Sequence, residues 1–405
     1  MSQPVKFCRI CGSTSITEFL NLGKQPLANA VLTKEQFHNE KFYPLRLGIC
    51  QECGLVQLLD IVNPEILFEN YAYFTGNSSE EWKKHFSELA AILSKDFSLS
   101  ENDLVVDIGS NDGTLLKNFK TKILGIDPAK NIVKLAIENG VPTICDYFSP
   151  VIADKIALTQ SRAKVILATN TFGHVNDLFT FMKGIQKLLT EDGIFVIEVP
   201  YFLETYKNVE FDTIYHEHLS YFLTNPLINL AHSFKIPVFK IEKLSTHGGS
   251  LRVYMGKNRE VEPSVAKIWE EECDLGLYKS RTYSGFGDKI NLIRENLINL
   301  VRTEYIQGKE ICGYGHPAKA SVLSNYCHLE KYIDYIIDTT PYKQGKFSPG
   351  THISIVSPDY FHNKPTDYSL IFAWNYKDEI MKKEKEFIKN GGKFIIPIPE
   401  PKVIP

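Results

Sequence analysis

The amino-acid sequence predicts an α/β protein whose main part is a parallel sheet covered by helices on both faces. In the middle of the chain, apolar strand-like segments alternate with helical stretches, which is typical of strands buried on both faces. These segments are 104–109, 122–127, 141–148, 164–170 and 193–200. A His-Gly-Gly turn between two further strand segments predicts a hairpin at the end of this sheet, over 236–244 and 249–257. A second, smaller doubly wound unit is predicted near the carboxyl terminus by segments 310–315, 332–340, 368–376 and 393–399.

The length of 405 residues, at roughly 150 residues per domain, corresponds to two or three domains. Hydrophobic residues make up 43% of the chain and charged residues 23%, a composition that excludes extended disorder. The formal net charge of -3 excludes a global positive field that would attract nucleic acid or an anionic membrane. Any anionic ligand must therefore be bound by a local pocket.

Targeting and redox signals indicate a cytoplasmic protein. No segment approaches the ~18 consecutive apolar residues of a membrane-spanning helix, and the first residues lack the apolar stretch of a secretion signal. In a reducing compartment, the eight cysteines are expected to be metal ligands or buried thiols rather than disulfides.

Four segments differ in their sequence pattern. Residues 1–65 combine short β-like runs with four cysteines, and 66–100 hold an aromatic loop followed by a helix with apolar residues at helical spacing. Ser78 and Glu81 have the spacing of a capping box for that helix. Residues 101–258 contain the predicted parallel sheet, and 259–405 contain a helical connector and the smaller α/β unit.

Two Cys-x-x-Cys pairs lie in the first segment, Cys8 with Cys11 and Cys50 with Cys53, and a glycine follows each pair. Four thiolates in a tetrahedron are a coordination set that Zn²⁺ accepts, and they leave no open position for water or substrate. The sequence therefore predicts a structural zinc site in residues 1–65.

The first predicted strand of the sheet ends in a glycine-containing turn with acidic residues. Because ligands of such folds bind at the carboxyl edge of the sheet, we expect a ligand over Gly109. Only Gly109 and Gly113 match the dinucleotide fingerprint, and Asp107 would repel a pyrophosphate but attract an ammonium group. Asp127, at the end of the next strand, could accept hydrogen bonds from both hydroxyls of a ribose. These features favour S-adenosylmethionine over NAD, with a binding set of Asp107, Gly109, Asn111, Gly113, Asp127, Pro128, Asp146 and Asn170.

Ionisable side chains are dense just beyond the fifth strand, where Tyr215, His216, Glu217 and His218 are consecutive. An imidazole can remove a proton near neutral pH, a carboxylate can orient it, and a phenol can hydrogen-bond a developing oxyanion. An ordinary polar loop and a metal site are the alternatives for this segment. His174 follows the fourth strand and is expected at the same edge of the sheet, either as a structural histidine or beside a ligand.

Two other segments could contact a substrate. The loop that contains Tyr71 and Tyr73 offers phenols for a lid over a sugar-like ligand, or for a domain interface. In the smaller unit, a strand, a glycine turn and a helix start carry His316 and Lys319, a suitable environment for phosphates. Lys343 follows the next strand and could neutralise the same anion.

Taken together, these motifs resemble the sugar C-methyltransferase family, whose members add a branching methyl group to nucleotide-linked deoxysugars. The resemblance covers nearly the whole chain. It rests on the order of the cysteine pairs, the Asp-Ile-Gly-Ser-Asn-Asp-Gly-Thr turn, the Tyr-x-Glu-His cluster, the His-Gly-Gly-Ser-Leu-Arg stretch (247–252) and the Pro-Ala-Lys and Lys-Gln-Gly segments. It implies a small N-terminal zinc-binding domain, a class I methyltransferase Rossmann-like central domain for S-adenosylmethionine, and a C-terminal Rossmann-like α/β domain that helps to hold the nucleotide sugar.

The resemblance also implies roles for individual residues. His218 would be the base that takes a proton from the carbon beside a sugar ketone, and Tyr215 and His174 would hydrogen-bond the resulting enolate. Glu217 would orient this cluster, and Tyr71 or Tyr73 would close over the substrate. The residues expected to contact the nucleotide sugar are Lys319, His316, Lys343, His247 and Arg252.

The predicted activity is methyl transfer from S-adenosylmethionine to the carbon beside the ketone, C3, of a nucleotide-diphosphate 4-keto-deoxysugar. Methylation of an oxygen or nitrogen of a related sugar is the nearest alternative. An NAD-dependent oxidoreductase and a zinc-stabilised binding protein without catalysis are alternatives of a different class. We expect a nucleotide-diphosphate sugar as partner, no nucleic acid and no membrane, and a monomer or weak homodimer.

Overall fold

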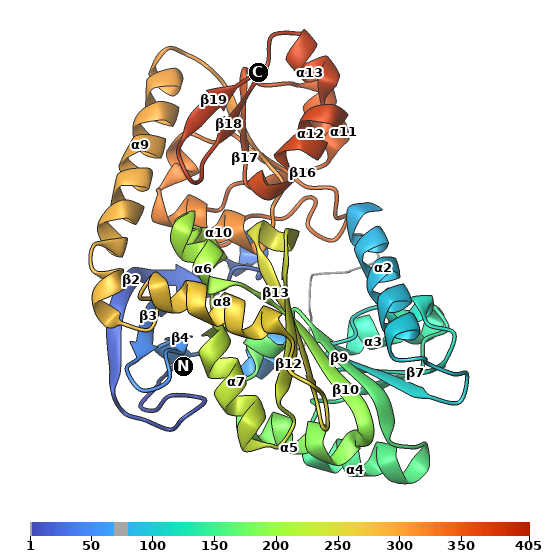
Figure 1. Cartoon of the computed structure of the whole chain (residues 1–405). Helices are drawn as coiled ribbons and strands as arrows, with labels where there is room; N and C mark the ends of the chain where they lie inside the picture. Colours follow the sequence, from blue (N-terminus) through green and yellow to red (C-terminus); the bar gives the residue numbers. More distant parts are fainter. Residues whose placement is uncertain (1, 69–79) are drawn as a thin grey trace.

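The structure is a computed structural model that describes residues 2–68 and 80–405, apart from the side chains of Glu80, Glu81 and His247 (Figure 1). The described residues form four sheets, with two, four, seven and six strands. The predicted α/β fold class is confirmed. Within the described residues, no helix has both the length and the apolar composition needed to cross a membrane.

The seven-stranded sheet is the predicted central sheet. Its strands are β6 (Leu104–Ile108), β7 (Lys122–Asp127), β8 (Thr143–Cys145), β9 (Ala163–Thr169), β10 (Leu189–Pro200), β12 (Val238–Leu244) and β13 (Ser250–Gly256). They lie in the order β12-β13-β10-β9-β6-β7-β8. The strands β6 to β10 pair in parallel, and β13 is antiparallel to both of its neighbours. Both the five predicted parallel strands and the hairpin are therefore confirmed.

Helices cover both faces of this sheet (Figure 1) because alternate strand residues point to opposite sides. Val105 packs with the predicted apolar stripe of α2 in one core, whereas Val106 packs with Phe181 and Ile185 of α5 in another. The helices are α2 (Glu80–Asp96), α3 (Lys130–Glu138), α4 (Pro150–Thr159), α5 (Leu178–Leu188), α6 (Phe202–Lys207), α7 (Thr224–Ser233) and α8 (Pro263–Asp274).

The amino-terminal sheet is antiparallel and includes one strand from the middle of the chain. Its strands are β2 (Ile16–Pro26), β3 (Phe42–Cys50), β4 (Val56–Leu58) and β11 (Ser220–Tyr221), in the order β11-β4-β3-β2. β1 (Gln3–Pro4) pairs with β5 (Asp60–Ile61), and α1 (Pro64–Phe68) follows. Because β11 pairs with β4, the first 65 residues are joined by backbone hydrogen bonds to the segment just after the predicted base cluster.

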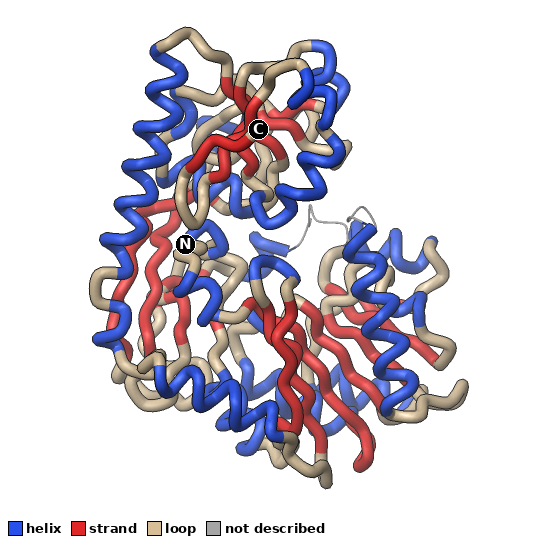
Figure 2. Tube along the Cα trace, turned by 45° about the horizontal axis from the view of Figure 1, so that its top comes forward, coloured by secondary structure: helices blue, strands red, loops and turns tan. Residues whose placement is uncertain are grey.

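The six-stranded sheet forms the second doubly wound unit. Its strands are β14 (Ile311–Tyr314), β15 (Ile336–Ile337), β16 (Ile355–Val356), β17 (Tyr368–Ile371), β18 (Lys393–Ile396) and β19 (Lys402–Ile404), in the order β16-β15-β14-β17-β18-β19. Its helices are α10 (Ala318–Tyr326), α11 (Pro358–Asn363), α12 (Lys377–Lys383) and α13 (Lys385–Lys389). The long helix α9 (Phe286–Ile306) precedes it and runs past the amino-terminal sheet, as both views show (Figures 1 and 2).

Candidate functional site

A cavity of about 670 Å³ lies where the three parts of the chain meet, and it is lined by the carboxyl ends of β6, β7, β9, β14 and β15. Most of the predicted site residues come together on its wall. They are Asp107, Gly109, Asn111, Asp127, Pro128, Asp146, Asn170, His174, Tyr215, Glu217, His218, His316, Lys319 and Lys343.

The turn after β6 is built by close packing. Gly109 has a φ of 74°, and a Cβ atom there would lie 2.1 Å from the Thr171 Oγ1 atom. A Cβ atom on Gly113 would lie 2.5 Å from a methyl group of Val141, and Gly113 does not line the cavity. Thr171 therefore fills the space that a Cβ atom on Gly109 would need. Gly109 still forms part of the cavity wall, and the ligand expected over it stays a prediction.

Asp107 is buried on the wall of the cavity, and its Oδ1 atom has no hydrogen-bond partner among the described residues. Burial, with the negative charges of Asp127 and Glu198 nearby, raises the pKa of Asp107 well above its ordinary value. A buried carboxylate without a partner is stabilised by a cation. This oxygen therefore fits the ammonium group of S-adenosylmethionine.

Asp127 holds the turn and also faces the cavity. Its carboxylate accepts hydrogen bonds from the backbone N–H groups of Asn111 (3.0 Å) and Ala129 (2.9 Å). Burial raises the pKa of Asp127 although these two donors oppose the shift. Each carboxylate oxygen has a second lone pair, so Asp127 retains acceptors for hydroxyl groups of a ribose.

Asp146 and Asn170 complete this end of the cavity. The Asp146 carboxylate accepts a hydrogen bond from the backbone of Tyr147 at 2.7 Å. Asn170, with a φ of 55°, follows β9 and donates its backbone N–H to Glu198 at 2.8 Å. A carboxylate in this position can accept a hydrogen bond from an exocyclic amine such as that of adenine.

The imidazole of His218 has a defined tautomer. Its Nδ1 atom lies 3.0 Å from the carbonyl oxygen of Thr213, and its Nε2 atom lies 2.7 Å from the Tyr215 hydroxyl. A carbonyl only accepts, so Nδ1 carries the proton, and in the neutral ring Nε2 accepts from Tyr215. The half-buried His218 therefore presents its basic nitrogen beside a phenol on the wall of the cavity.

His174 stacks on His218 with ring centroids 5.2 Å apart, and Phe68 stacks on the other side at 5.6 Å. His174 belongs to the short helix Phe172–His174 that follows β9. Removal from water lowers the pKa of His174 to about 4. This imidazole is therefore neutral near neutral pH and can donate one N–H to an oxygen in the cavity.

Glu217 and His216 point to partners in the amino-terminal segment. The buried Glu217 carboxylate accepts from the side-chain amide of Asn29 at 2.7 and 3.0 Å, and both residues line the cavity. His216 is buried against the backbone carbonyls of Tyr43 and Pro44, at 3.3 and 3.2 Å, and does not line the cavity. Of the two histidines in this cluster, only His218 can therefore meet a ligand there.

The opposite end of the cavity holds Lys319 and Lys343, together with the carboxylates of Glu210 and Asp338. The Lys319 Nζ atom is buried 4.3 Å from the centre of the Trp374 ring and has no hydrogen-bond partner within the described chain. Lys343 donates to the backbone carbonyl of His316 at 2.6 Å and lies 3.6 Å from Asp338. Burial, aided by Lys343, lowers the pKa of His316 to about 3, so this imidazole is neutral.

Four predicted residues do not contribute described side chains to the cavity. Arg252 lies buried in β13, where it pairs with Glu198 at 2.7 Å, and it does not line the cavity. The side chain of His247, and the residues Tyr71 and Tyr73, lie outside the described part of the structure. In the structure, the charge of Arg252 neutralises a buried carboxylate within the sheet.

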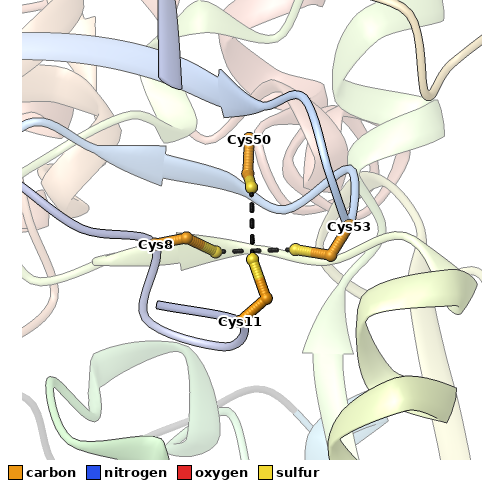
Figure 3. A group of neighbouring side chains, drawn as sticks. All are labelled: Cys8, Cys11, Cys50 and Cys53. Carbon is orange, nitrogen blue, oxygen red and sulfur yellow. Dashed lines mark hydrogen bonds between the residues drawn. The ribbon is translucent and has the colours of Figure 1, made fainter. Parts of the chain in front are cut away.

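The four cysteines of the amino-terminal segment form a compact cluster (Figure 3). All four sulfur atoms lie within 4.8 Å of one another, with Cys8 and Cys53 at 3.5 Å and Cys11 and Cys50 at 3.4 Å. Zn–S bonds of about 2.3 Å in a tetrahedron place sulfur atoms about 3.8 Å apart. The cluster therefore fits a zinc ion held by four thiolates.

Several residues of the site were not predicted from the sequence. Asn29 binds the Glu217 carboxylate from a segment 188 positions away, and Phe68 stacks on His174. Asp338 had the clearest signal, since it follows a strand just as Asp127 does. Asn29 had none, because its contact depends on how distant segments meet.

Comparisons with known proteins agree with this architecture. Three family models match in order: a zinc binding domain over residues 8–68, a methyltransferase domain over 78–234 and a C-methyltransferase C-terminal domain over 245–399. The chain is 37% identical over 410 residues to the C-methyltransferase NovU of Streptomyces niveus, an alignment that covers 99% of this chain and 97% of that relative.

Solved structures are more distant. The PH0226 protein of Pyrococcus horikoshii is 14% identical, covers 48% of this chain and 98% of its own, and has a TM-score of 0.37. The magnesium protoporphyrin IX methyltransferase of Synechocystis, solved with bound SAH, is 11% identical with a TM-score of 0.35, and covers 46% of this chain and 91% of its own. Likenesses this slight carry no weight for the site.

Proposed function

Because this chain belongs to the C-methyltransferase family and is an S-adenosylmethionine-dependent methyltransferase, we propose that its acceptor is a nucleotide-diphosphate 4-keto-deoxysugar. The methyl group goes to C3, one of the two carbons beside the ketone at C4. The observation that carries the proposal is the basic nitrogen of His218, which lies on a cavity with an unpaired carboxylate at one end and lysines at the other.

The charge distribution supports the placement of the two ligands. The acidic end, with Asp107 and Asp127, suits a cofactor that carries ammonium and sulfonium groups. The basic end, with Lys319 and Lys343, suits the diphosphate of a nucleotide sugar. His218 and His174 lie on the wall of the same cavity, so a sugar bound by its diphosphate can present its ketone to them.

The proposed chemistry begins with proton removal. His218 Nε2 takes the proton from the carbon beside the ketone, the C–H bond breaks, and its electron pair moves to the ketone oxygen as an enolate forms. Thr213, whose carbonyl accepts from Nδ1, stabilises the imidazolium that results. The Tyr215 O–H, which donates to Nε2 at 2.7 Å in the structure, turns to the ketone oxygen when the sugar binds, and this frees the Nε2 lone pair. Tyr215 and neutral His174 then donate hydrogen bonds to the enolate oxygen.

The remaining residues position the reactants. When bound, S-adenosylmethionine would supply an electrophilic methyl group to the enolate carbon; the S–CH₃ bond would break, and its electron pair would stay on the sulfur of the departing S-adenosylhomocysteine. Glu217, fixed by Asn29, and Tyr71 or Tyr73 are assigned to orienting and covering the sugar. The zinc site holds the amino-terminal segment together, and the protein works in the cytoplasm as a monomer or weak homodimer.

The base assignment is tested without any methyl donor. In D₂O, the wild-type protein is expected to exchange deuterium into the carbon beside the ketone of dTDP-4-keto-6-deoxyglucose. His218→Asn should slow this exchange by at least about 100-fold, the usual contribution of a general base. His232→Asn changes an exposed histidine on α7 and should leave the rate unchanged. Exchange at the wild-type rate in His218→Asn would remove His218 from the mechanism.

A further inference from the structure

We propose that Arg9, which stands between two cysteines of the zinc cluster, is a positioning residue for His218. The zinc-binding segment Cys8–Cys11 then helps to position the base in addition to stabilising the fold. This inference rests on the proposed function in one respect, that His218 is the base.

Arg9 is 9% exposed and its guanidinium connects three segments of the chain. Nη1 donates to the carbonyl of Leu219 at 3.0 Å, and Nη1 and Nη2 both donate to the carbonyl of Leu58 at 3.1 Å. Nε points to the side-chain oxygen of Asn176 at 3.4 Å. Leu219 directly follows His218, and Asn176 lies two residues after His174, so one side chain contacts the backbone beside His218 and a side chain near His174.

The carbonyl of Leu219 is the centre of a continuous set of hydrogen bonds. It accepts from the backbone N–H of Leu58 at 3.0 Å as well as from Arg9, and the N–H of Leu219 donates to Gly173 at 2.9 Å. Gly173 precedes His174 in the chain. A shift of Leu219 would therefore be transmitted to both rings of the stacked pair, whose centroids lie 5.2 Å apart.

The other end of Arg9 is fixed by the cysteine cluster. Its backbone N–H donates to the Gln57 side chain at 3.0 Å, and its neighbour Cys8 lies 3.5 Å from Cys53. Two positive charges on zinc and four negative thiolates leave a net charge of -2 on a loaded site. No carboxylate forms an ion pair with Arg9 among residues 2–68 and 80–405, and Cys8 is the main negative group that acts on its guanidinium.

The chemistry of the side chain explains why arginine suits this position. A guanidinium is planar and always charged, and it offers five N–H donors in a fixed fork. Lysine would keep the charge but act as a point donor on a flexible stem, and methionine would keep the apolar stem and lose every donor. The variants Arg9→Lys and Arg9→Met therefore separate the charge of Arg9 from its geometry.

The test compares Arg9→Met with Arg46→Met. Arg46 is the matched control because it pairs with Asp60 at 2.8 Å and Glu18 at 3.1 Å inside the amino-terminal sheet, away from the cavity. Both variants should retain zinc by metal analysis and bind S-adenosylhomocysteine like the wild type. Arg9→Met should exchange deuterium into dTDP-4-keto-6-deoxyglucose about 10- to 100-fold more slowly in kcat, with KM little changed. Arg9→Lys should be intermediate, and Arg46→Met normal.

A second readout needs no substrate. In nitrogen-15 NMR spectra of the zinc-loaded protein, the His218 ring signals, identified by their loss in His218→Asn, should shift or broaden in Arg9→Met and stay unchanged in Arg46→Met. Zinc-loaded Arg9→Met with wild-type exchange and unchanged His218 signals would overturn the inference. Should Arg9→Met not fold, Arg9→Lys is judged by the same two outcomes. Absence of exchange in the wild type would overturn the proposed function instead, while the ring signals would still decide whether Arg9 holds His218.

Discussion

Two turns on opposite sides of the cavity share one backbone design. In the central sheet, Gly109 N–H donates to the carbonyl of Ile126 at 2.7 Å; in the smaller sheet, Gly315 N–H donates to Ile337 at 2.7 Å. In each case an acid follows the neighbouring strand. Asp338 accepts from the N–H groups of His316 and Thr340, both at 2.8 Å, much as Asp127 accepts from Asn111 and Ala129.

The two turns differ in charge. Asp107 stands two residues before Gly109 without a hydrogen-bond partner in the described chain for its Oδ1 atom, whereas Gly313 has the same position before Gly315. Burial raises the pKa of Asp127. At Asp338 burial acts in the same direction, but Lys343 and the hydrogen bonds from Thr340 outweigh it and lower the pKa. The same fold element thus faces a cation at one end of the cavity and an anion at the other.

The turn therefore provides a binding position in both units, and the charged residues beside it determine which ligand that position binds. A glycine turn with an acid after the next strand is common to both units. The unpaired carboxylate and the two lysines distinguish them. The predictions below change these charges or the turns that carry them.

The largest effect is expected from Asp107→Asn. Loss of the charge that faces an ammonium group should weaken S-adenosylhomocysteine binding by about 3 kcal/mol, roughly 100-fold, and leave dTDP-glucose binding unchanged in calorimetric titrations. Because the pKa of Asp107 is raised in the folded protein, its ionised form opposes folding above its unfolded pKa, and the variant should melt at a higher temperature. Asp154→Asn, on the exposed partner of Lys187, is the control. Equal losses of both ligands would break the comparison.

The two glycines should differ in what they tolerate. Gly109 and Gly315 have φ angles of 74° and 78°, so alanine at either position is strained by about 1 kcal/mol. A Cβ atom on Gly109 also meets Thr171 at 2.1 Å, whereas one on Gly315 meets Ala373 at 3.3 Å. Chemical denaturation should therefore show Gly109→Ala about 2 kcal/mol less stable than Gly315→Ala. Adding Thr171→Ala should recover part of the loss; no recovery would contradict the assigned clash.

Lys319→Met removes positive charge from the other end of the cavity. Its Nζ atom is buried without a hydrogen-bond partner among the described residues, but its charge favours the ionised forms of the buried Glu210 and Asp212, so the variant should also be less stable. Affinity for dTDP-glucose should fall by about 1.4 kcal/mol, or tenfold, with S-adenosylhomocysteine binding unaffected. Lys331→Met, at an exposed position, is the control. If calorimetry shows that the variant binds dTDP-glucose as tightly as the wild type, Lys319 does not bind the diphosphate.

The smallest effect is a difference in pH dependence. As pH falls through the raised pKa of Asp107, its carboxylate takes up a proton and loses its attraction for an ammonium group. Affinity for S-adenosylhomocysteine should then fall, by at most about tenfold per pH unit. Binding should also release protons, which is measured by comparing binding enthalpies in buffers that differ in their enthalpy of ionisation. Binding of dTDP-glucose should not weaken as pH falls. Asp338, whose pKa is lowered, keeps its charge, and protonation of Glu210, whose pKa burial raises to about 7, removes a negative charge near Lys319. Parallel pH profiles for both ligands would contradict the assignment.

Much of the fold could be predicted because its signals are local. The apolar runs of β6, β7, β9 and β10 follow from periodicity, and the cysteine spacing indicated the cluster that the structure contains. The strands β15 and β16 have two residues each, too few to show a period, and the predicted strand at 368–376 ends at Ile371.

The site was less accessible to sequence reasoning where it depends on long-range contacts. The sequence predicted a ligand over Gly109 but gave no sign that Thr171, from the loop after β9, would pack against this glycine. The hydrogen bond from Arg9 to the carbonyl of Leu219 joins residues 210 positions apart, and no local pattern predicts it. The sequence shows which residues are charged. It does not show which residues pair with them, because the pairing depends on the tertiary fold.

The most direct test of the account is the position of the transferred methyl group. The protein is incubated with S-adenosylmethionine labelled with carbon-13 in its methyl group and with dTDP-4-keto-6-deoxyglucose, and the product is examined by carbon-13 NMR. If His218 acts as the base between the bound methyl donor and the bound nucleotide sugar, the labelled methyl group will be bonded to the carbon beside the ketone. The hydrogen of that carbon will be absent from the product. A labelled methyl group bonded to oxygen or nitrogen would contradict the account.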